Sequence, residues 1–309
     1  MLLCMNAPLM SSLPRERAVV PDEDKIAWRR QIPFILVHVL PLLAFATGTR
    51  WQDWAVCLAL YYLRMIAITA GYHRYFSHKT YKLGRVMQFL MALAGTSAAQ
   101  KGVLWWAANH RHHHRYSDQE QDIHSPKKGF WWSQVGWIMV TKYDATRWDR
   151  IKDFAKFPEL RFLNNHWWLP PTLLGLVVFL VGGWSMLWIG FFLSTAALYH
   201  GVFTINSLAH VFGKRRYATT DTSRNNWLLA IITCGEGWHN NHHHFCASAN
   251  QGFYWWEIDV SFYFIKGLQA LGLAWDVRKP SQAALERNRL DRTDAPIDVA
   301  MLPALGDAE

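Results

Sequence analysis

The sequence predicts an all-α integral membrane protein with four transmembrane helices arranged as two hairpins. Four apolar runs occur in two closely spaced pairs, and the long segment between the pairs is polar and basic. The 309-residue chain also contains 18 Trp, a residue whose amphipathic ring suits the membrane interface. A Trp-rich soluble core is the alternative that composition alone leaves open.

The four apolar runs set the expected spans. The first pair covers 32–48 and 54–72, and the second pair covers 168–183 and 186–206, with a Gly-Gly turn between them. Each run approaches the roughly 20 residues that cross a bilayer core, although 168–183 is short. A buried helical hairpin of a soluble protein is the alternative. Arg64 interrupts the second run, and we expect it to face the protein interior because a charge in lipid is costly.

Charge placement predicts the orientation. The segment 73–166 carries 15 Lys or Arg against 7 Asp or Glu, whereas the two hairpin turns are nearly uncharged. The positive-inside rule therefore places 73–166, 207–280 and both termini in the cytosol, with the inner membrane of a cell as the location. The net charge of +9 is interleaved with apolar runs, which argues against a nucleic-acid partner. The four cysteines form no CxxC pair and suit a reducing compartment.

The remaining segments flank a main domain at 31–280. Residues 1–30 are polar and lack the pattern of a cleaved signal peptide, so we expect a loose cytosolic segment. The apolar stretch 86–99 is too short to span, and lies on the membrane surface or covers the catalytic domain. In 281–309 we expect one short helix near 281–290 followed by a largely disordered tail.

Histidine clusters are the most informative feature of the sequence. They occur as HRYFSH at 73–78, HRHHHR at 110–115, NSLAH at 206–210 and HNNHHH at 239–244. Positions i, i+3 and i+4 share one face of an α-helix, so the second and fourth clusters each present three histidines on one face. His112 and His244 point off those faces. His73 and His78 would diverge by about 140° on an α-helix, so they reach different metals or the helix ends between them.

Without His112 and His244, the clusters offer nine histidines and no carboxylate, and all the clusters lie at or beyond the cytosolic ends of the expected spans. Nine ligands are too many for one tetrahedral zinc and suit two metals. Neutral imidazole binds zinc, copper, iron and nickel, so the ligand type alone does not select the metal. Unconnected surface histidines are the alternative.

The four motifs, in this order and with these hairpins, resemble the membrane-bound acyl-CoA desaturases of the stearoyl-CoA, delta-9-like type. The resemblance covers about 32–280. It implies a cytosolic helical cap that holds two iron ions, with no catalytic residue separate from the ligands. By motif, the implied ligands are His73, His78, His110, His113, His114, His210, His239, His242 and His243, with Asn206 approaching a metal through water.

Residues beside the ligands are candidates to brace them. Arg111 and Arg115 lie within the second cluster, Asp118 follows it, and Glu236 precedes the fourth; a helix-capping carboxylate is the alternative for Glu236. His124 has no metal partner by spacing, and we assign it no role.

The resemblance also implies the reaction. Oxygen is a co-substrate, two electrons arrive from a separate ferredoxin or from a b-type cytochrome with its reductase, and a cis double bond enters a long acyl chain. The substrate is an acyl-CoA, with a phospholipid-bound chain as the alternative. Regiochemistry requires a narrow apolar tunnel, for which 104–106, 130–132 and 254–256 are candidate walls or interface anchors. Lysines and arginines on the cap could hold the CoA headgroup and an acidic electron carrier. The rivals are a hydroxylase of the same superfamily and a non-catalytic membrane metal carrier.

Overall fold

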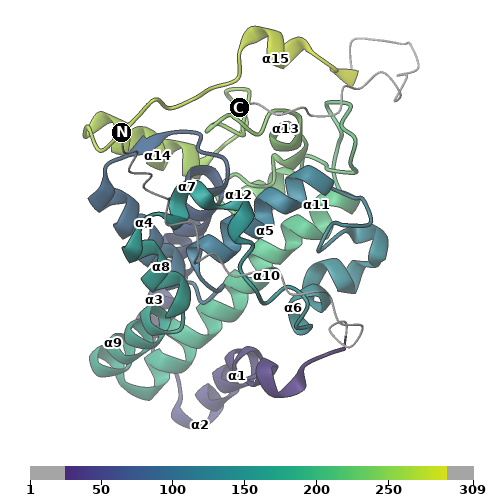
Figure 1. Ribbon diagram of the computed structural model, residues 1–309. Coiled ribbons are helices and arrows are strands. Elements are labelled where there is room, and N and C mark those ends of the chain that lie inside the picture. The colour runs from purple at the N-terminus through teal and green to yellow at the C-terminus, as the bar shows by residue number, and fades with distance from the viewer. Residues whose placement is uncertain (1–24, 291–309) are drawn as a thin grey trace, which may run out of the picture.

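Helices form nearly all of the regular structure in the computed structural model, which describes residues 25–290. Three helical stretches in this part of the chain are long and apolar enough to cross a membrane: Trp28–Thr47, Trp51–Ser77 and Leu169–Val211. Figure 1 shows helices α1, α2 and α9 at one end of the molecule and α13 and α15 at the other. Three stretches, rather than four separate helices, therefore meet the requirements for a span.

The first stretch is broken by proline. Pro33 and Pro41 each lie at the first positions of a helical segment, where the missing N–H is tolerated. The stretch ends at Gly48, whose positive φ of 72° suits glycine. Its segments are η2 (Trp28–Gln31), α1 (Ile32–Val39), η3 (Leu40–Leu43) and α2 (Ala44–Thr47).

The second stretch joins α3 (Trp51–Ile66) to a π-helix, η4 (Ala67–Ser77). Arg64 is buried at 3% exposure and donates to Ser194 Oγ and, at 2.7 Å, to Thr195 Oγ1. The predicted inward orientation of this arginine is confirmed, and hydroxyl groups rather than a carboxylate satisfy it.

The third stretch folds back on itself. Gly183 interrupts the helix with φ 70° and ψ −160°, at the predicted Gly-Gly turn. A Cβ on Gly175 would lie 3.3 Å from the ring of Phe191, although a straight helix would separate these residues by about 24 Å. The two arms therefore form a hairpin within one helical stretch. Its segments are α9 (Leu169–Met186), η8 (Leu187–Leu193), α10 (Ser194–Asn206) and α11 (Leu208–Val211).

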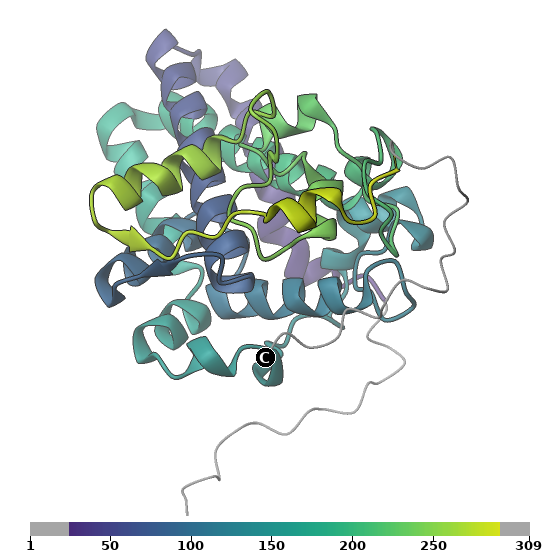
Figure 2. The ribbon, with the colours of Figure 1, turned by 90° about the horizontal axis from the view of Figure 1, so that it is seen from above.

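The rest of the described chain forms a helical cap with one short sheet, in which β1 (Lys82–Leu83) pairs antiparallel with β2 (Ala274–Trp275). Seen from above in Figure 2, the yellow segment that carries α15 crosses over the green helices. His244 Nε2 lies 2.7 Å from Ala284 O and joins this segment to α13. The predicted short helix near 281–290 is therefore confirmed, whereas the predicted tail beyond it lies outside the described residues. The cap helices are α4 (Arg85–Thr96), α5 (Val103–Tyr116), η5 (Pro126–Lys128), η6 (Trp132–Gly136), α6 (Trp137–Met139), η7 (Trp148–Arg150), α7 (Lys152–Ala155), α8 (Pro158–Asn165), α12 (Trp227–Ile232), α13 (His239–His244), α14 (Val260–Ala270) and α15 (Gln282–Glu286).

The largest hydrophobic core surrounds the π-helix η4. Tyr72, Phe76, Leu104 and Leu160 are at most 1% exposed and belong to one continuous cluster. Because η4 and α5 are both packed into this core, the histidines that they carry are held in fixed positions relative to one another.

Candidate metal centre

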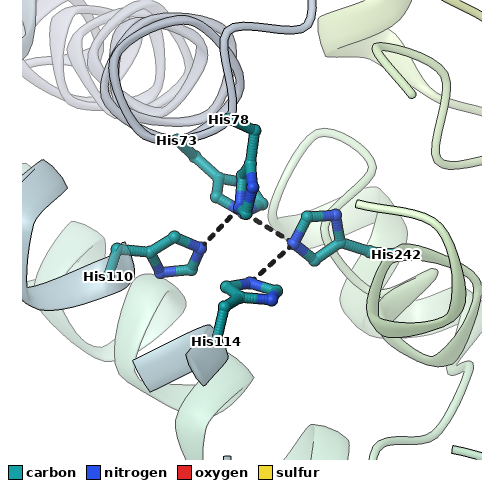
Figure 3. Close-up of side chains that lie close together, drawn as sticks. All are labelled: His73, His78, His110, His114 and His242. Atoms are coloured by element: carbon teal, nitrogen blue, oxygen red, sulfur yellow. Dashed lines mark hydrogen bonds between the residues drawn. The ribbon is translucent and has the colours of Figure 1, made fainter. Parts of the chain in front are cut away.

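Five histidines converge from three separate segments. One ring nitrogen from each of His73, His78, His110, His114 and His242 lies within 4.8 Å of those of the other four. Figure 3 shows these rings pointing toward a common centre from η4, α5 and α13. We call this set the five-histidine group.

The π-helix explains how His73 and His78 join one group. The backbone N–H of His78 bonds to the carbonyl of His73 at 3.2 Å, the i to i+5 pattern of a π-helix. This pattern stacks residues five apart, as an α-helix stacks residues four apart. The expectation that the two rings diverge to different metals, which rested on α-helical geometry, is therefore wrong. The alternative, that the helix ends between them, is confirmed, because η4 ends at Ser77 and His78 is its C-terminal cap.

Spacing between the nitrogens matches a coordination shell. Nε2 of His242 lies 3.0 Å from Nε2 of both His73 and His114, and Nε2 of His78 lies 2.9 Å from that of His110. With imidazole–metal bonds of about 2.1 Å, ligands at right angles lie about 3.0 Å apart and tetrahedral ligands about 3.4 Å apart. The five-histidine group therefore suits a metal with more than four ligands.

A second group lies beside the first. Nitrogens of His113, His210 and His243 lie within 4.8 Å of one another, and His239 Nε2 lies 3.1 Å from His210 Nε2. We call these residues the four-histidine group. His113 lies on the same helical face as His110 and His114 but belongs to the other group. A cavity of about 40 Å³ is lined by residues of both groups and by Asn206.

Carboxylates orient several of these rings from behind. Nδ1 of His243 lies 2.6 Å from Asp221, Nδ1 of His113 lies 3.0 Å from Asp122, and Nδ1 of His210 lies 3.5 Å from Asp118. A proton on Nδ1 leaves the lone pair of Nε2 free for a metal. His243 Nε2 is buried with no hydrogen-bond partner, as expected for an atom that awaits a metal.

In the five-histidine group, Glu236 lies behind a ring as these aspartates do in the four-histidine group. Its Oε2 lies 2.6 Å from His73 Nδ1, and its Oε1 accepts from Nε and Nη2 of Arg74 at 3.1 and 3.0 Å. Arg74 is fully buried and also bonds to both oxygens of Asp259 at 2.8 Å. Glu236 therefore contacts a candidate ligand and does not cap a helix.

Burial keeps most of these imidazoles neutral. It lowers the pKa values of His78, His110, His114, His239 and His242 well below the ordinary value, and neighbouring imidazoles add to the effect. Neutral imidazoles can accept a metal without first releasing a proton.

The carboxylates behind the rings stay charged. Burial alone would raise the pKa of Asp118, but hydrogen bonds from His210 and Thr222 outweigh burial and lower this pKa to about 2. The pKa of Asp221 is held well below its usual value against burial by His243 and Ser223. At neutral pH both groups are therefore acceptors for a ring N–H.

Arg111 and Asp118 support the site through backbone contacts as well. Arg111 donates to the carbonyls of Phe76 and Ser77 at 2.6 and 2.9 Å, and so holds the end of η4 just before His78. Asp118 accepts from both the backbone and the hydroxyl of Thr222 at 2.7 Å. Arg115, in contrast, is exposed and lies over the ring of Tyr116.

The histidines predicted to point away from the metals do so. His112 Nε2 lies 3.0 Å from the carbonyl of Gln121, and the ring of His244 stacks on Tyr217. His124, to which spacing assigned no role, packs against His113 with ring centroids 4.3 Å apart. It forms a cluster with His113 and Asp122, but Asp122 already contacts Nδ1 of His113. We therefore interpret His124 as an outer neighbour of the four-histidine group.

A long cavity of about 1180 Å³ opens onto the histidines. Its mouth is polar, with Arg29, Arg30, Lys101 and Asp144. Its lining also includes His110 and Asn206 and, from α9 and η8, the apolar side chains of Phe179, Trp184 and Leu187. Of the three Trp stretches predicted as tunnel walls, only 104–106 contributes to its lining; Trp131, Trp255 and Trp256 are exposed.

Comparison with known proteins identifies the family. The model of the fatty acid desaturase family matches residues 49–260, which is more than half of the chain. The chain belongs to the fatty acid desaturase family. All ten predicted ligand positions lie within the matched residues of this desaturase, and members of the family use a di-iron centre.

Curated relatives of the desaturase act on two kinds of acyl carrier, according to their names. It is 37% identical to the sn-1 stearoyl-lipid 9-desaturase of Synechocystis, over 87% of this chain and 86% of the relative. It is 38% identical to the delta-9 acyl-lipid desaturase 2 of Arabidopsis thaliana, over 90% and 95%. It is also 38% identical to the acyl-CoA C20 Delta5-desaturase of Anemone leveillei, over 80% of each chain.

The residues of the desaturase fit a pair of divalent metals. The two histidine groups bring nine imidazoles together in two neighbouring sets, and buried carboxylates lie behind the rings of His73, His113, His210 and His243. Nε2 of His242 faces Nε2 of both His73 and His114. A ring nitrogen carries at most one proton, so hydrogen bonds alone do not account for both short contacts, whereas a shared metal ion would.

Proposed function

We propose that this chain catalyses the oxygen-dependent desaturation of a long-chain fatty acyl group, placing a cis double bond near the delta-9 position. The observation that carries the proposal is the junction of two histidine groups with a long apolar cavity. His110 belongs to the five-histidine group and lines the cavity, and Asn206 lies on the same wall. A chain that fills this cavity passes the centre at one fixed depth.

Nine histidines would hold the two irons: His73, His78, His110, His114 and His242 around one, and His113, His210, His239 and His243 around the other. The pair of irons would supply the oxygen activation that removal of hydrogen from an unactivated methylene pair requires. The overall reaction consumes one O₂, two electrons and two protons, and yields the alkene and two water molecules.

The protein's own residues position the acyl chain and exclude water. An acyl chain has no polar group near the target carbons, so the cavity wall must set the reacting position. Trp105, Trp106, Phe191 and Phe203 line the cavity, and their large apolar rings restrict its width; the indole N–H of Trp105 is already donated to the carbonyl of Tyr143. The pKa values of the neutral imidazoles favour metal binding over protonation at neutral pH.

The location and partners follow from the same arrangement. We propose four membrane crossings in the inner membrane of a cell, with the two arms of the Gly183 hairpin as the third and fourth. Both termini and the cap would then be cytosolic, where a separate ferredoxin or b-type cytochrome with its reductase supplies electrons. An acyl-CoA and a lipid-bound acyl chain are both compatible with the relatives' names.

Expression in a host that lacks unsaturated fatty acids tests the function. We expect a new cis-alkene in the host lipids, and mass spectrometry after derivatisation locates the double bond. An alcohol instead of an alkene would identify a hydroxylase. Stoichiometric metal without any oxygen-dependent product would identify a metal carrier and overturn the proposal.

A further inference from the structure

One wall of the long cavity is formed by a helix that is only lightly packed. Phe34 and Val37 of α1 line the cavity, next to Tyr199 and Phe203 of α10. In the stretch Trp28–Thr47, Ala44 is the only buried residue, and most of its apolar side chains are exposed. A single helix therefore separates the cavity from the surrounding lipid at this seam.

The stretch is held by contacts at three levels. At the cap end Gln31 Nε2 donates to Ile138 O at 3.0 Å, and at the far end Ala44 packs with Trp188. Between these anchors, ring contacts and a contact between two imidazoles close the seam between α1 and α10. The rings of Phe34 and Tyr199 stack with centroids 5.6 Å apart, and Nε2 of His38 lies 3.1 Å from Nε2 of His200.

The pair formed by His38 and His200 is unusual in its position. Both residues lie in spans, His200 is exposed on the surface that faces lipid, and neither belongs to the two metal groups. Polar side chains at such positions are costly and are typically retained for a function. A hydrogen bond between helices in lipid is only moderately strong, so this contact can open and close.

The same pair is connected to the metal centre. His200 Nδ1 lies 3.3 Å from Gln134 Nε2, and Gln134 Oε1 accepts a short hydrogen bond from the hydroxyl of Ser207. Ser207 follows Asn206, which lines both cavities. The state of the seam is therefore coupled to the part of α10 that approaches the histidines.

Charge at the polar mouth indicates which acyl carrier fits. Asp144 lies within ion-pair distance of both Arg30 and Lys101, so one carboxylate offsets part of the charge of the three basic residues there. Coenzyme A carries three phosphate groups and calls for a stronger cationic surface, whereas the headgroup of a membrane lipid carries at most a small charge.

We propose that the seam between α1 and α10 is a lateral gate through which an acyl chain, still esterified to a membrane lipid, enters the cavity from the bilayer. Phe34 and His38 form one side of the gate and Tyr199 and His200 form the other. The proposal rests on the proposed desaturase function and names its substrate class. The lipid headgroup stays at the membrane surface near the polar mouth while the chain slides between the helices.

A reversible cross-link tests the gate. The pair His38→Cys and His200→Cys is introduced into a chain in which all four native cysteines, Cys4, Cys57, Cys234 and Cys246, are changed to Ala, and the two single-cysteine chains serve as matched controls. Each protein is reconstituted in vesicles of a saturated phospholipid with an electron donor. A short bis-methanethiosulfonate reagent bridges the pair, dithiothreitol releases it, and both the alkene product and the iron content per chain are measured.

We expect bridging to lower the rate on the phospholipid at least tenfold, with full recovery after reduction, unchanged iron content and no effect on the single-cysteine chains. An undiminished rate in the bridged protein, or a loss of iron on bridging, would overturn the gate. Conversion of palmitoyl-CoA but not of the vesicle lipid by the unbridged enzyme would overturn the substrate class and leave desaturation intact. A failure to convert either substrate would instead count against the proposed function itself.

Discussion

Replacement of Asp221 by Asn should remove one metal and leave the other. Oδ2 of Asp221 faces His243 Nδ1 at 2.6 Å, while Oδ1 accepts from Ser223 N at 2.9 Å. Both oxygens therefore face N–H donors, and an amide has only one oxygen to offer them. If its NH₂ group faces His243, the ring proton moves to Nε2, which then cannot bind a metal.

Loss of such an outer partner costs about 10–100-fold in metal affinity, or about 1.4–2.7 kcal/mol. Asp221 contacts only the four-histidine group, so the five-histidine group should keep its ion. We expect the iron content of the Asp221→Asn protein to fall from two ions per chain toward one as the chelator concentration is raised. Mass spectrometry measures the number of irons per chain at each chelator concentration. Equal loss of both irons, or retention of both at the wild-type chelator concentration, would refute this tautomer argument.

Three further outcomes can be checked in the same way. His242→Ala removes a predicted ligand that contacts two others and should abolish iron loading and product formation. His112→Ala changes a ring that lies off the shared histidine face of its helix, and this protein should keep two irons. Equal losses of iron in the two variants would contradict the face assignment. Thr195→Val removes one acceptor from the buried Arg64 guanidinium and should destabilise the protein by about 1.5–3 kcal/mol, seen as a lower thermal transition temperature in detergent. An unchanged transition would mean that the remaining acceptors, Ser194 Oγ and the carbonyl of Leu60, satisfy the guanidinium without Thr195. The lysine in Arg74→Lys cannot reproduce the forked contacts of the guanidinium to two carboxylates, and the substitution should lower the free energy of unfolding by about 3–5 kcal/mol, so that little monodisperse protein is recovered. A wild-type yield would argue against a structural role for this network.

The faces of the histidine helices could be predicted because an α-helix has a fixed period. His110, His113 and His114 on α5, and His239, His242 and His243 on α13, do lie on common faces. Helical periodicity predicts which residues share a face, but not which of the two histidine groups each residue joins. The division of His113 from its two neighbours depends on how α5 lies between the two groups, which is a tertiary property.

The π-helix and the outer carboxylates could not be predicted from spacing. No known residue pattern marks a π-helix. Only the five-residue separation of His73 and His78 is consistent with one, because a π-helix brings residues five apart onto one side. Asp122 and Asp221 lie in loops with no regular spacing to the rings that they contact, nine and 22 residues away. Glu236 was found because it precedes a cluster directly; a search for buried acids near each cluster would also have found Asp122.

Electrostatics explains why these acids lie one layer behind the metals. Nine imidazole ligands would leave the charge of two divalent ions uncompensated, and the carboxylates of Asp118, Asp122, Asp221 and Glu236 lie behind the rings, where they would supply four negative charges through ring N–H groups. The remaining buried pair at this site, Arg74 with Asp259, cancels. Burial alone would lower the pKa of His113, but Asp122 outweighs burial and raises it, which shows how strongly these acids favour positive charge at the ring positions. Two bound divalent ions would supply that positive charge, so we expect metal binding to stabilise the fold around the site.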